Sequence, residues 1–187
     1  MTVNHEELQS IAYNLLRAIG EDPDRPGLKD TPRRFADAWR EFIDYDQGNY
    51  ETTFESVQVN QMVVVSGMKV WSICEHHLLP FWANVSIGYL TGHKVLGLSK
   101  FARITQLYAH RLQLQEQLVE QVAEEVLRLT ETPNVAVLAE GEHLCMTMRG
   151  AKTSARMVSS SLRGVFREEP DARAEFLKLV EMSTRHL

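Results

Sequence analysis

Residues 81–90 read FWANVSIGYL and alternate apolar side chains with small or polar ones, the apolar members including Val85, Ile87 and Tyr89. A period of two predicts a β-strand with one face in the core. The pair Thr91-Gly92 directly after it marks a turn. Before it, residues 57–71 are rich in β-branched side chains, and the break at Ser66-Gly67 predicts two strands there. The middle of the chain is therefore expected to build a sheet.

Helical patterns flank this sheet. Residues 8–19 follow the spacing of an amphipathic helix that ends at Gly20, and Thr31-Pro32 is typical of an N-cap followed by a first-turn proline. Ser99 is expected to cap a short helix to His110, and two more helices are expected over 118–129 and from Pro170. The remaining strands are predicted at 135–138, 144–149 and 153–159. This mixture predicts an α+β architecture.

Composition excludes several classes of protein. The chain has 187 residues, of which 44% are hydrophobic and 24% charged, so a disordered chain or a disulfide scaffold is not expected. No apolar run approaches the roughly 18 residues of a membrane span. The N-terminus is polar and acidic, unlike a secretory signal, and we expect a cytoplasmic protein without a membrane partner. The net charge of −5 argues against nucleic acid as the main partner.

The charges are unevenly distributed along the chain. The forty residues between Glu75 and Glu116 contain no acid, and neither does the stretch from His143 to Arg167, although both contain several Lys and Arg. Basic stretches in an acidic protein favour a small polyanionic ligand over bulk nucleic acid. Chance segregation along the chain is the alternative.

Both cysteines stand close to histidines. Cys74 and His77 are three residues apart in the sequence CEHH, and Cys145 follows His143 by two residues. A disulfide is disfavoured in a reducing cytoplasm, so a metal site or a reactive thiolate is the favoured interpretation of the two cysteines. Thiolate together with imidazole favours zinc over magnesium or calcium, which prefer oxygen ligands.

A strand at 144–149 would project His143, Cys145 and Arg149 from one face. Zinc ligated by Cys74, His77 and Cys145 would keep its fourth position open for water, which is the arrangement of catalytic zinc. His76 and His143 would then be candidates for proton transfer. The alternative is a closed structural site, in which one of these two histidines supplies the fourth ligand.

Two further features carry weaker signals. Ser99, Lys100 and Arg103 cluster at a predicted helix start, where backbone N–H groups and basic side chains can hold phosphate together. Serine is also an ordinary N-cap, and lysine is usually only solvated. Glu116 lies in the first turn of a predicted helix, and from the residues alone it is a surface glutamate that favours the helix dipole.

Taken together, these stretches resemble the GTP cyclohydrolase I family over about residues 31–180. The similarity includes the TPRR helix start at residue 31. The other matching stretches are CEHHLLPF (74–81), VLGLSK (95–100), ARI (102–104), RLQLQE (111–116), HLCM (143–146), MRG (148–150) and LRGVF (162–166).

The resemblance implies a tunnelling fold, an antiparallel sheet with helices packed on it, assembled as a toroidal homodecamer with active sites at subunit interfaces. It implies an N-terminal helical segment over 1–50 and a catalytic domain over 51–187, built as one structural unit. The implied reaction is the hydrolysis of GTP at C8 with release of formate and formation of 7,8-dihydroneopterin triphosphate. This reaction is the first step of tetrahydrofolate, pterin or deazapurine biosynthesis.

The resemblance also assigns roles by position. It implies zinc as cofactor, with three ligands: Cys74, His77 and Cys145. It implies three catalytic residues, namely His143 at N7 of the purine, and His76 acting near the ribose with Ser99. It implies that Glu116, with the neighbouring Gln115, binds guanine. It implies triphosphate contacts from Lys100, Arg103 and Arg149, with Arg34 added from a neighbouring subunit.

This chain departs from the family pattern without removing a zinc ligand or a proton-transfer group. These departures bear on substrate affinity and subunit packing. The residues that depart are Asp37, Ala83, Asn84, Ser86 and Gln117. Two other functions are weighed against the cyclohydrolase. One is the nitrile-reducing oxidoreductase of queuosine synthesis, which uses a cysteine and NADPH. The other is a non-catalytic pterin- or nucleotide-binding scaffold with structural zinc.

Overall fold

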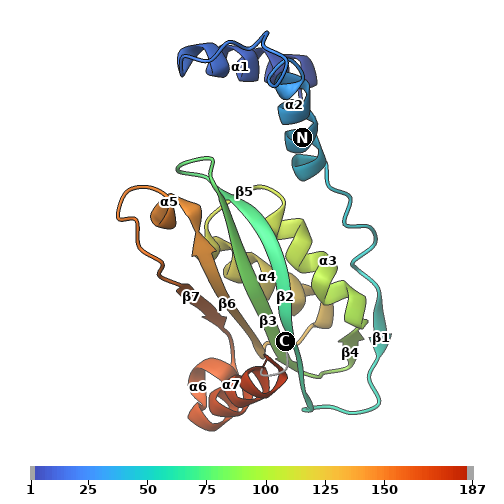
Figure 1. Ribbon diagram of the computed structural model, residues 1–187. Coiled ribbons are helices and arrows are strands. Elements are labelled where there is room, and N and C mark those ends of the chain that lie inside the picture. The colour runs from blue at the N-terminus through green and yellow to red at the C-terminus, as the bar shows by residue number, and fades with distance from the viewer. Residues whose placement is uncertain (1–2, 185–187) are drawn as a thin grey trace. The chain divides into compact units, whose positions relative to one another are not determined.

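The computed structural model describes residues 3–184 and divides into two compact units, one up to Asp46 and one from Gln47 (Figure 1). The first unit is a pair of helices, α1 (His5–Ala18) and α2 (Thr31–Ile43). Both helices lie where the spacing of apolar residues predicts them, so these predictions are confirmed. No helix in the described range is long and apolar enough to cross a membrane.

The two helices begin in different ways. The Asn4 side chain accepts a hydrogen bond from the Glu7 amide and so caps α1. The prediction that Thr31 caps the second helix is wrong, because α2 is preceded by Asp30, whose side chain makes no capping bond. The Thr31 amide donates instead to the Leu28 carbonyl, which continues the preceding turn into the helix. Pro32 lies in the first turn as predicted.

The second unit contains a five-stranded sheet in the order β5-β2-β3-β6-β7. Four strands form its antiparallel part, and they are β2 (Met62–Cys74), β3 (Pro80–Leu90), β6 (Val135–His143) and β7 (Met157–Leu162). The short β5 (Leu112–Gln113) pairs with β2 in parallel. A separate two-stranded ribbon joins β1 (Thr53–Glu55) to β4 (Lys94–Leu96).

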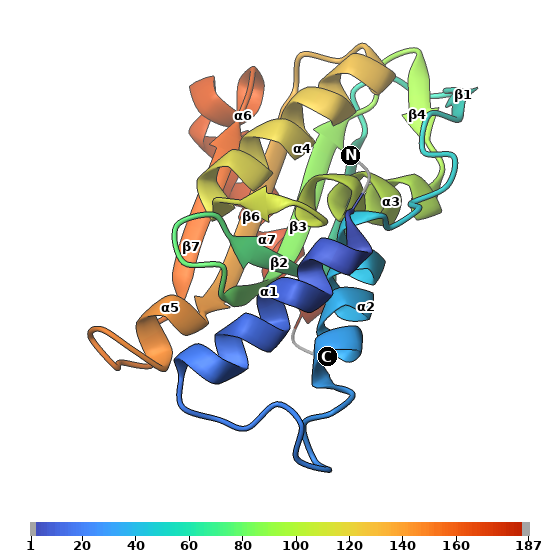
Figure 2. The same ribbon diagram turned by 90° about the horizontal axis from the view of Figure 1, so that it is seen from above.

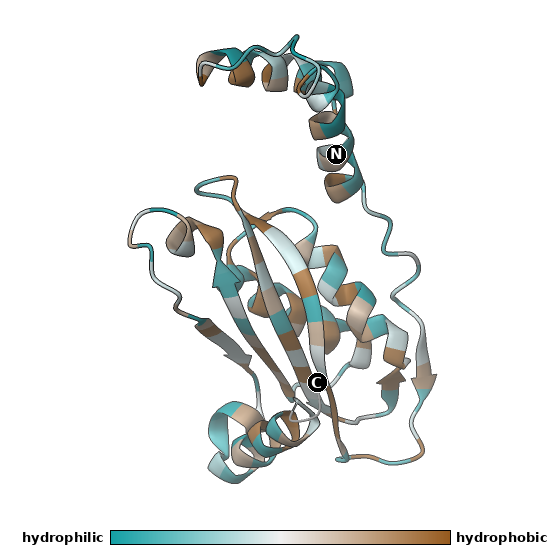
Figure 3. Ribbon diagram, in the orientation of Figure 1, coloured by the Kyte–Doolittle hydropathy of each residue, from teal (hydrophilic) through white to brown (hydrophobic). Residues whose placement is uncertain are grey.

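The long helices α3 (Leu98–Ala109) and α4 (Gln115–Thr130) cover one face of this sheet (Figure 2). Val85, Ile87 and Tyr89 of β3 are fully or almost fully buried against them, as the alternating pattern predicts. Hydrophobic and hydrophilic residues alternate along the strands in Figure 3. The opposite face packs against α7 (Pro170–Thr184), which follows the short α6 (Val165–Glu168). The architecture is therefore α+β, as the sequence indicates.

Several predicted strands differ from the structure. The two strands expected over 57–71 are one strand, β2, because the break at Ser66-Gly67 is absorbed as a shift in register between Val65 and Met68. Gly67 takes a positive φ of 70° at this point. The strand expected at 153–159 lies further along the chain as β7, where it extends the sheet beside β6.

Gly88 permits the close packing of α7 on β3. A β-carbon at this position would lie 2.5 Å from Cδ2 of Phe176, which is completely buried. We expect Gly88→Ala to lower the free energy of unfolding by about 1–3 kcal/mol through overpacking. Gly92→Ala is the matched control, because its β-carbon would meet nothing closer than the Thr130 carbonyl at 4.0 Å. Thermal or urea denaturation of both variants tests the expectation, and equal stabilities would contradict it.

Candidate metal centre and active site

Three metal-binding side chains meet at one end of the sheet. The ligand atoms of Cys74, His77 and Cys145 all lie within 4.8 Å of one another. Cys74 Sγ is 3.7 Å from Nδ1 of His77. Cys74 is buried at the last position of β2, and Cys145 is half-buried in the short helix α5 (Leu144–Thr147). The three residues that the sequence indicated as ligands are therefore brought together.

A tight turn between β2 and β3 places His77 beside Cys74. The Cys74 amide donates to the Leu79 carbonyl at 2.9 Å, and the Leu78 amide donates to the Cys74 carbonyl at 2.9 Å. Leu78 takes a left-handed φ of 53°, which closes the turn. The spacing of three residues thus brings sulfur and imidazole together through backbone hydrogen bonds alone.

Cys145 reaches the cluster by a route that the sequence did not predict. The prediction of a strand at 144–149 is wrong, because residues 144–147 form a helix. His143, Cys145 and Arg149 therefore do not share one face of a strand. The pairing of β3 with β6 ends at Phe81 and His143, so the chain beyond His143 has no strand to pair with. It turns instead, and the Met148 amide donates to the Leu144 carbonyl at 3.1 Å.

The chemistry of these donors fits a thiophilic divalent cation such as zinc. Thiolates are soft ligands and imidazole also suits zinc, and three protein ligands correspond to a site with an open position. Burial raises the pKa of the Cys145 thiol, and the adjacent Cys74 raises it further. A bound cation offsets this cost, because it stabilises the thiolate form.

His143 lies next to this cluster but outside the group of ligands. Its ring stacks on Phe81 with centroids 4.4 Å apart and planes only 6° from parallel. Its Nε2 is 3.0 Å from Oε1 of Gln115. Burial lowers the pKa of His143, while the charge of Glu116 opposes that shift. Glu116 is exposed in the first turn of α4, next to the buried Gln115.

His76 also lies beside the ligands without being one of them. Its imidazole is 62% exposed, and its ring centroid is 6.1 Å from that of His77 in an edge-to-face arrangement. Its Nε2 is 4.0 Å from a carboxylate oxygen of Glu75. The Phe81 ring is a neighbour of the site that sequence reasoning did not single out. Phe81 is the last residue of the CEHHLLPF stretch (74–81).

The predicted phosphate-binding residues lie in the N-terminal half of α3. The prediction that Ser99 caps this helix is wrong, because Gly97 holds the cap position and the exposed Ser99 is already helical. Lys100 Nζ and Arg103 Nη1 both donate to the Asn49 carbonyl, at 2.7 and 3.1 Å. No side-chain pattern could have indicated this acceptor, because it belongs to the backbone.

Within one chain, these cations lie toward the opposite end of α3 from the metal cluster. The twelve residues of α3 span about 18 Å. The helix starts next to β4 and ends next to β5, which pairs with Cys74 (Figure 1). Arg149 is exposed beyond α5 and is close enough to Cys145 to act on its pKa. Arg34 is exposed in the N-terminal unit, 3.7 Å from Asp30.

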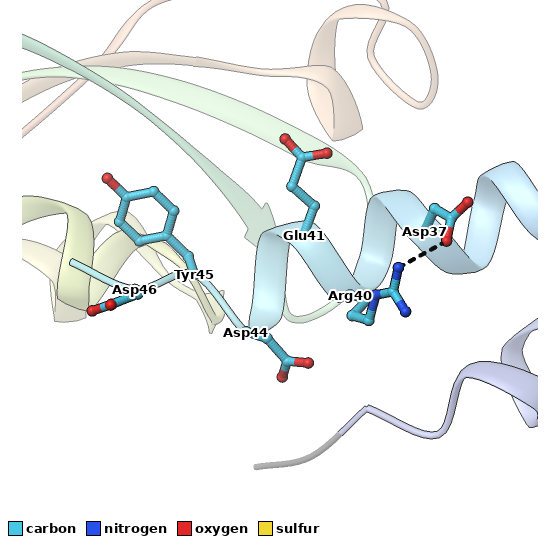
Figure 4. A pocket seen from close by; sticks show the side chains of 6 residues that line it. All are labelled: Asp37, Arg40, Glu41, Asp44, Tyr45 and Asp46. Atoms are coloured by element: carbon cyan, nitrogen blue, oxygen red, sulfur yellow. Dashed lines mark hydrogen bonds and ion pairs between the residues drawn. The ribbon is translucent and has the colours of Figure 1, made fainter. Parts of the chain in front are cut away.

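An open hollow of about 510 Å³ lies along the C-terminal end of α2 (Figure 4). Its lining residues are Asp37, Arg40, Glu41, Asp44, Tyr45 and Asp46. Asp37 accepts hydrogen bonds from His5 and Arg40, and the bond from His5 is the main reason that its pKa is lowered. Four carboxylates against one arginine make this hollow unsuited to a polyanionic ligand.

Comparison with known proteins agrees with this geometry. The family model for GTP cyclohydrolase I matches residues 8–181. The chain belongs to the GTP cyclohydrolase I family. It is 44% identical to GTP cyclohydrolase 1 of Deinococcus radiodurans over 97% of this chain and 87% of that protein. It is 43% identical to GTP cyclohydrolase 1 of Aquifex aeolicus, over 97% of this chain and 99% of that protein.

A third relative, GTP cyclohydrolase 1 of Drosophila melanogaster, is 47% identical over 89% of this chain and 53% of its own. Among solved structures, the archaeosine synthase QueF-Like in its apo form aligns with a TM-score of 0.45 and 20% identity. That alignment covers 56% of this chain and 96% of the other. A likeness at this level does not discriminate between functions.

Proposed function

We propose that this chain is a zinc-dependent GTP cyclohydrolase I, which converts GTP and water to 7,8-dihydroneopterin triphosphate and formate. The observation that carries the proposal is the convergence of Cys74, His77 and Cys145 beside two imidazoles outside the ligand group. The stacking of His143 on Phe81 and its hydrogen bond to Gln115 favour a proton-transfer role over a fourth ligand. A structural zinc site would not require the imidazoles of His76 and His143 beside the ligands.

In this proposal, zinc held by the three ligands supplies a Lewis acid that activates water near neutral pH. His143 gives a proton to N7 of the purine, which makes C8 electrophilic. Glu116, exposed beside His143, accepts hydrogen bonds from the guanine N–H groups and so selects the base. His76 and Ser99 serve the later rearrangement of the ribose.

The triphosphate is assigned to Lys100, Arg103 and Arg149, with Arg34 from a neighbouring subunit. Lys100 and Arg103 lie toward the far end of α3 from the metal cluster of their own chain. This separation supports a site shared between subunits, as in a toroidal homodecamer with the tunnelling fold. The proposed setting is the cytoplasm, at the first step of tetrahydrofolate, pterin or deazapurine biosynthesis, with neither nucleic acid nor membrane as partner.

The direct test is formate release from GTP together with pterin fluorescence after oxidation, with and without a zinc chelator. Formation of both products, abolished by chelation and restored by zinc, would support the proposal. Binding of GTP without either product would favour the non-catalytic scaffold. Reduction of a nitrile substrate with NADPH would favour the oxidoreductase.

We expect Cys145→Ala to lose both zinc and activity, because two remaining ligands hold the metal poorly. Zinc content is measured on the purified protein by elemental analysis. His76→Ala is the matched control, since His76 adjoins the cluster but is not among its ligand atoms, and this variant should retain about one zinc per chain. A full zinc content in Cys145→Ala would show that the ligand group is wrong.

We expect Gly48→Ala to weaken GTP binding several-fold. Gly48 has a positive φ of 65°, and its added β-carbon would collide with Nη1 of Arg103. Gly20→Ala is the matched control, because its φ is 88° but its β-carbon would meet nothing within 4 Å. Both variants should lose about 1 kcal/mol of stability from backbone strain. A KM for GTP that rises equally in both, or in neither, would show that the position of the Arg103 guanidinium beside Gly48 does not affect GTP binding.

A further inference from the structure

The side chain of Gln115 is buried and fully hydrogen-bonded at the start of α4. Its exposed fraction is 0%. Its Nε2 lies 3.0 Å from the Ala139 carbonyl, 3.0 Å from the Met157 carbonyl and 3.1 Å from the Ser159 hydroxyl. These acceptors belong to the neighbouring strands β6 and β7, so the amide joins α4 to the sheet.

This environment fixes which end of the amide faces His143. Backbone carbonyls accept hydrogen bonds and cannot donate them, so the amide nitrogen must face Ala139 and Met157. The opposite orientation would place the amide oxygen against two carbonyl oxygens in a buried site, where only the Ser159 hydroxyl could donate to it. Oε1 of Gln115 therefore faces Nε2 of His143, at 3.0 Å.

The same logic fixes the hydrogen on the histidine ring. The amide oxygen can only accept, so Nε2 of His143 must be the donor. A neutral imidazole carries one hydrogen, and with that hydrogen on Nε2 the lone pair lies on Nδ1. The ring plane is held by stacking on Phe81.

Gly141 provides the space for this arrangement. A β-carbon there would lie 2.6 Å from Oε1 of Gln115 and would collide with the Trp82 carbonyl. Any larger residue at position 141 would push the amide oxygen away from His143. The strand, the amide and the imidazole thus form one packed unit.

We propose that Gln115 is a positioning residue, which holds His143 as the Nε2–H tautomer and leaves Nδ1 to exchange the proton with substrate. The inference rests on the proposed role of His143. When Nδ1 has taken up a proton from solvent, the ring carries hydrogens on both nitrogens; the Nδ1–H bond then breaks with its electron pair remaining on Nδ1, and the N7 lone pair of the purine forms the new N–H bond. The imidazole that remains is the neutral tautomer whose Nε2–H donates to Gln115. The buried amide is not free to bind guanine, which falls to Glu116.

The tautomer is measured first, without substrate. Solid-state NMR of the zinc-loaded protein with isotope-labelled histidine distinguishes Nε2–H from Nδ1–H rings, and comparison with His143→Ala assigns the signal. At about pH 8, where an ordinary histidine is neutral, we expect the Nε2–H form in the wild-type protein. We expect this preference to be lost in Gln115→Met. An Nδ1–H signal in the wild-type protein would overturn the proposal, whatever the reaction.

Kinetics give the second test. We expect Gln115→Met to lower kcat for formate release about 10- to 100-fold, the range typical of residues that orient a catalytic group, with KM changed less than about threefold. Gln113→Met is the matched control, since Gln113 is 1% exposed and donates to the Tyr108 carbonyl and to Gln121 without contacting His143. It should lose similar stability but keep the tautomer and most of kcat.

The outcomes separate the two proposals. Equal losses of kcat in Gln115→Met and Gln113→Met would reduce Gln115 to a packing role and overturn the inference. A wild-type protein that releases no formate would instead contradict the proposed function. If Gln115→Met does not fold, the tautomer of the wild-type ring still decides the question.

Discussion

The site depends on the backbone pairing at the first residues of β3. Phe81 pairs with Ser72 of β2 on one side and with His143 of β6 on the other. Strand pairing is specific in register, because a slip of one residue would turn every side chain to the opposite face. This register therefore brings the end of β2 and the end of β6 to one edge of the sheet. The turn carrying Cys74 and His77 and the helix carrying Cys145 are neighbours as a result.

The buried polar groups around this edge are satisfied by one another. Gln115 connects α4 to two strands, and Gln113 bonds to the Tyr108 carbonyl and to Gln121. Buried amides that lose a partner cost about 1–3 kcal/mol each, so such networks resist rearrangement. The imidazole of His143 is therefore held in a fixed orientation by its hydrogen bond to Gln115, which is itself fixed in the core. A ring held in this way loses little entropy when substrate binds, which suits the proton-transfer role proposed for His143.

Local signals in the sequence indicated Cys74 and His77 as candidate metal ligands, whereas the position of Cys145 and the rest of the site depend on tertiary pairing. Cys74 and His77 lie within one tight turn, so their spacing alone indicated a shared ion. The helix at residues 144–147 could not be foreseen, because it forms where β3 offers β6 no further partner. The single strand β2 likewise depends on a bulge that only its partner strand reveals. The contacts of Gln115 were hidden because its acceptors come from distant strands.

Lys100 and Arg103 donate to the same backbone carbonyl, that of Asn49. Two cations that share one carbonyl acceptor repel each other, and a neutral oxygen offsets little of that repulsion. A triphosphate offers several charged oxygens and relieves it far better. Both cations lie in the N-terminal half of α3, whereas the helix ends next to β5, which pairs with Cys74; this placement is what supports the proposal of a site shared between subunits. If the proposed assembly is correct, substrate binding and assembly are linked, because each complete site would then require an interface.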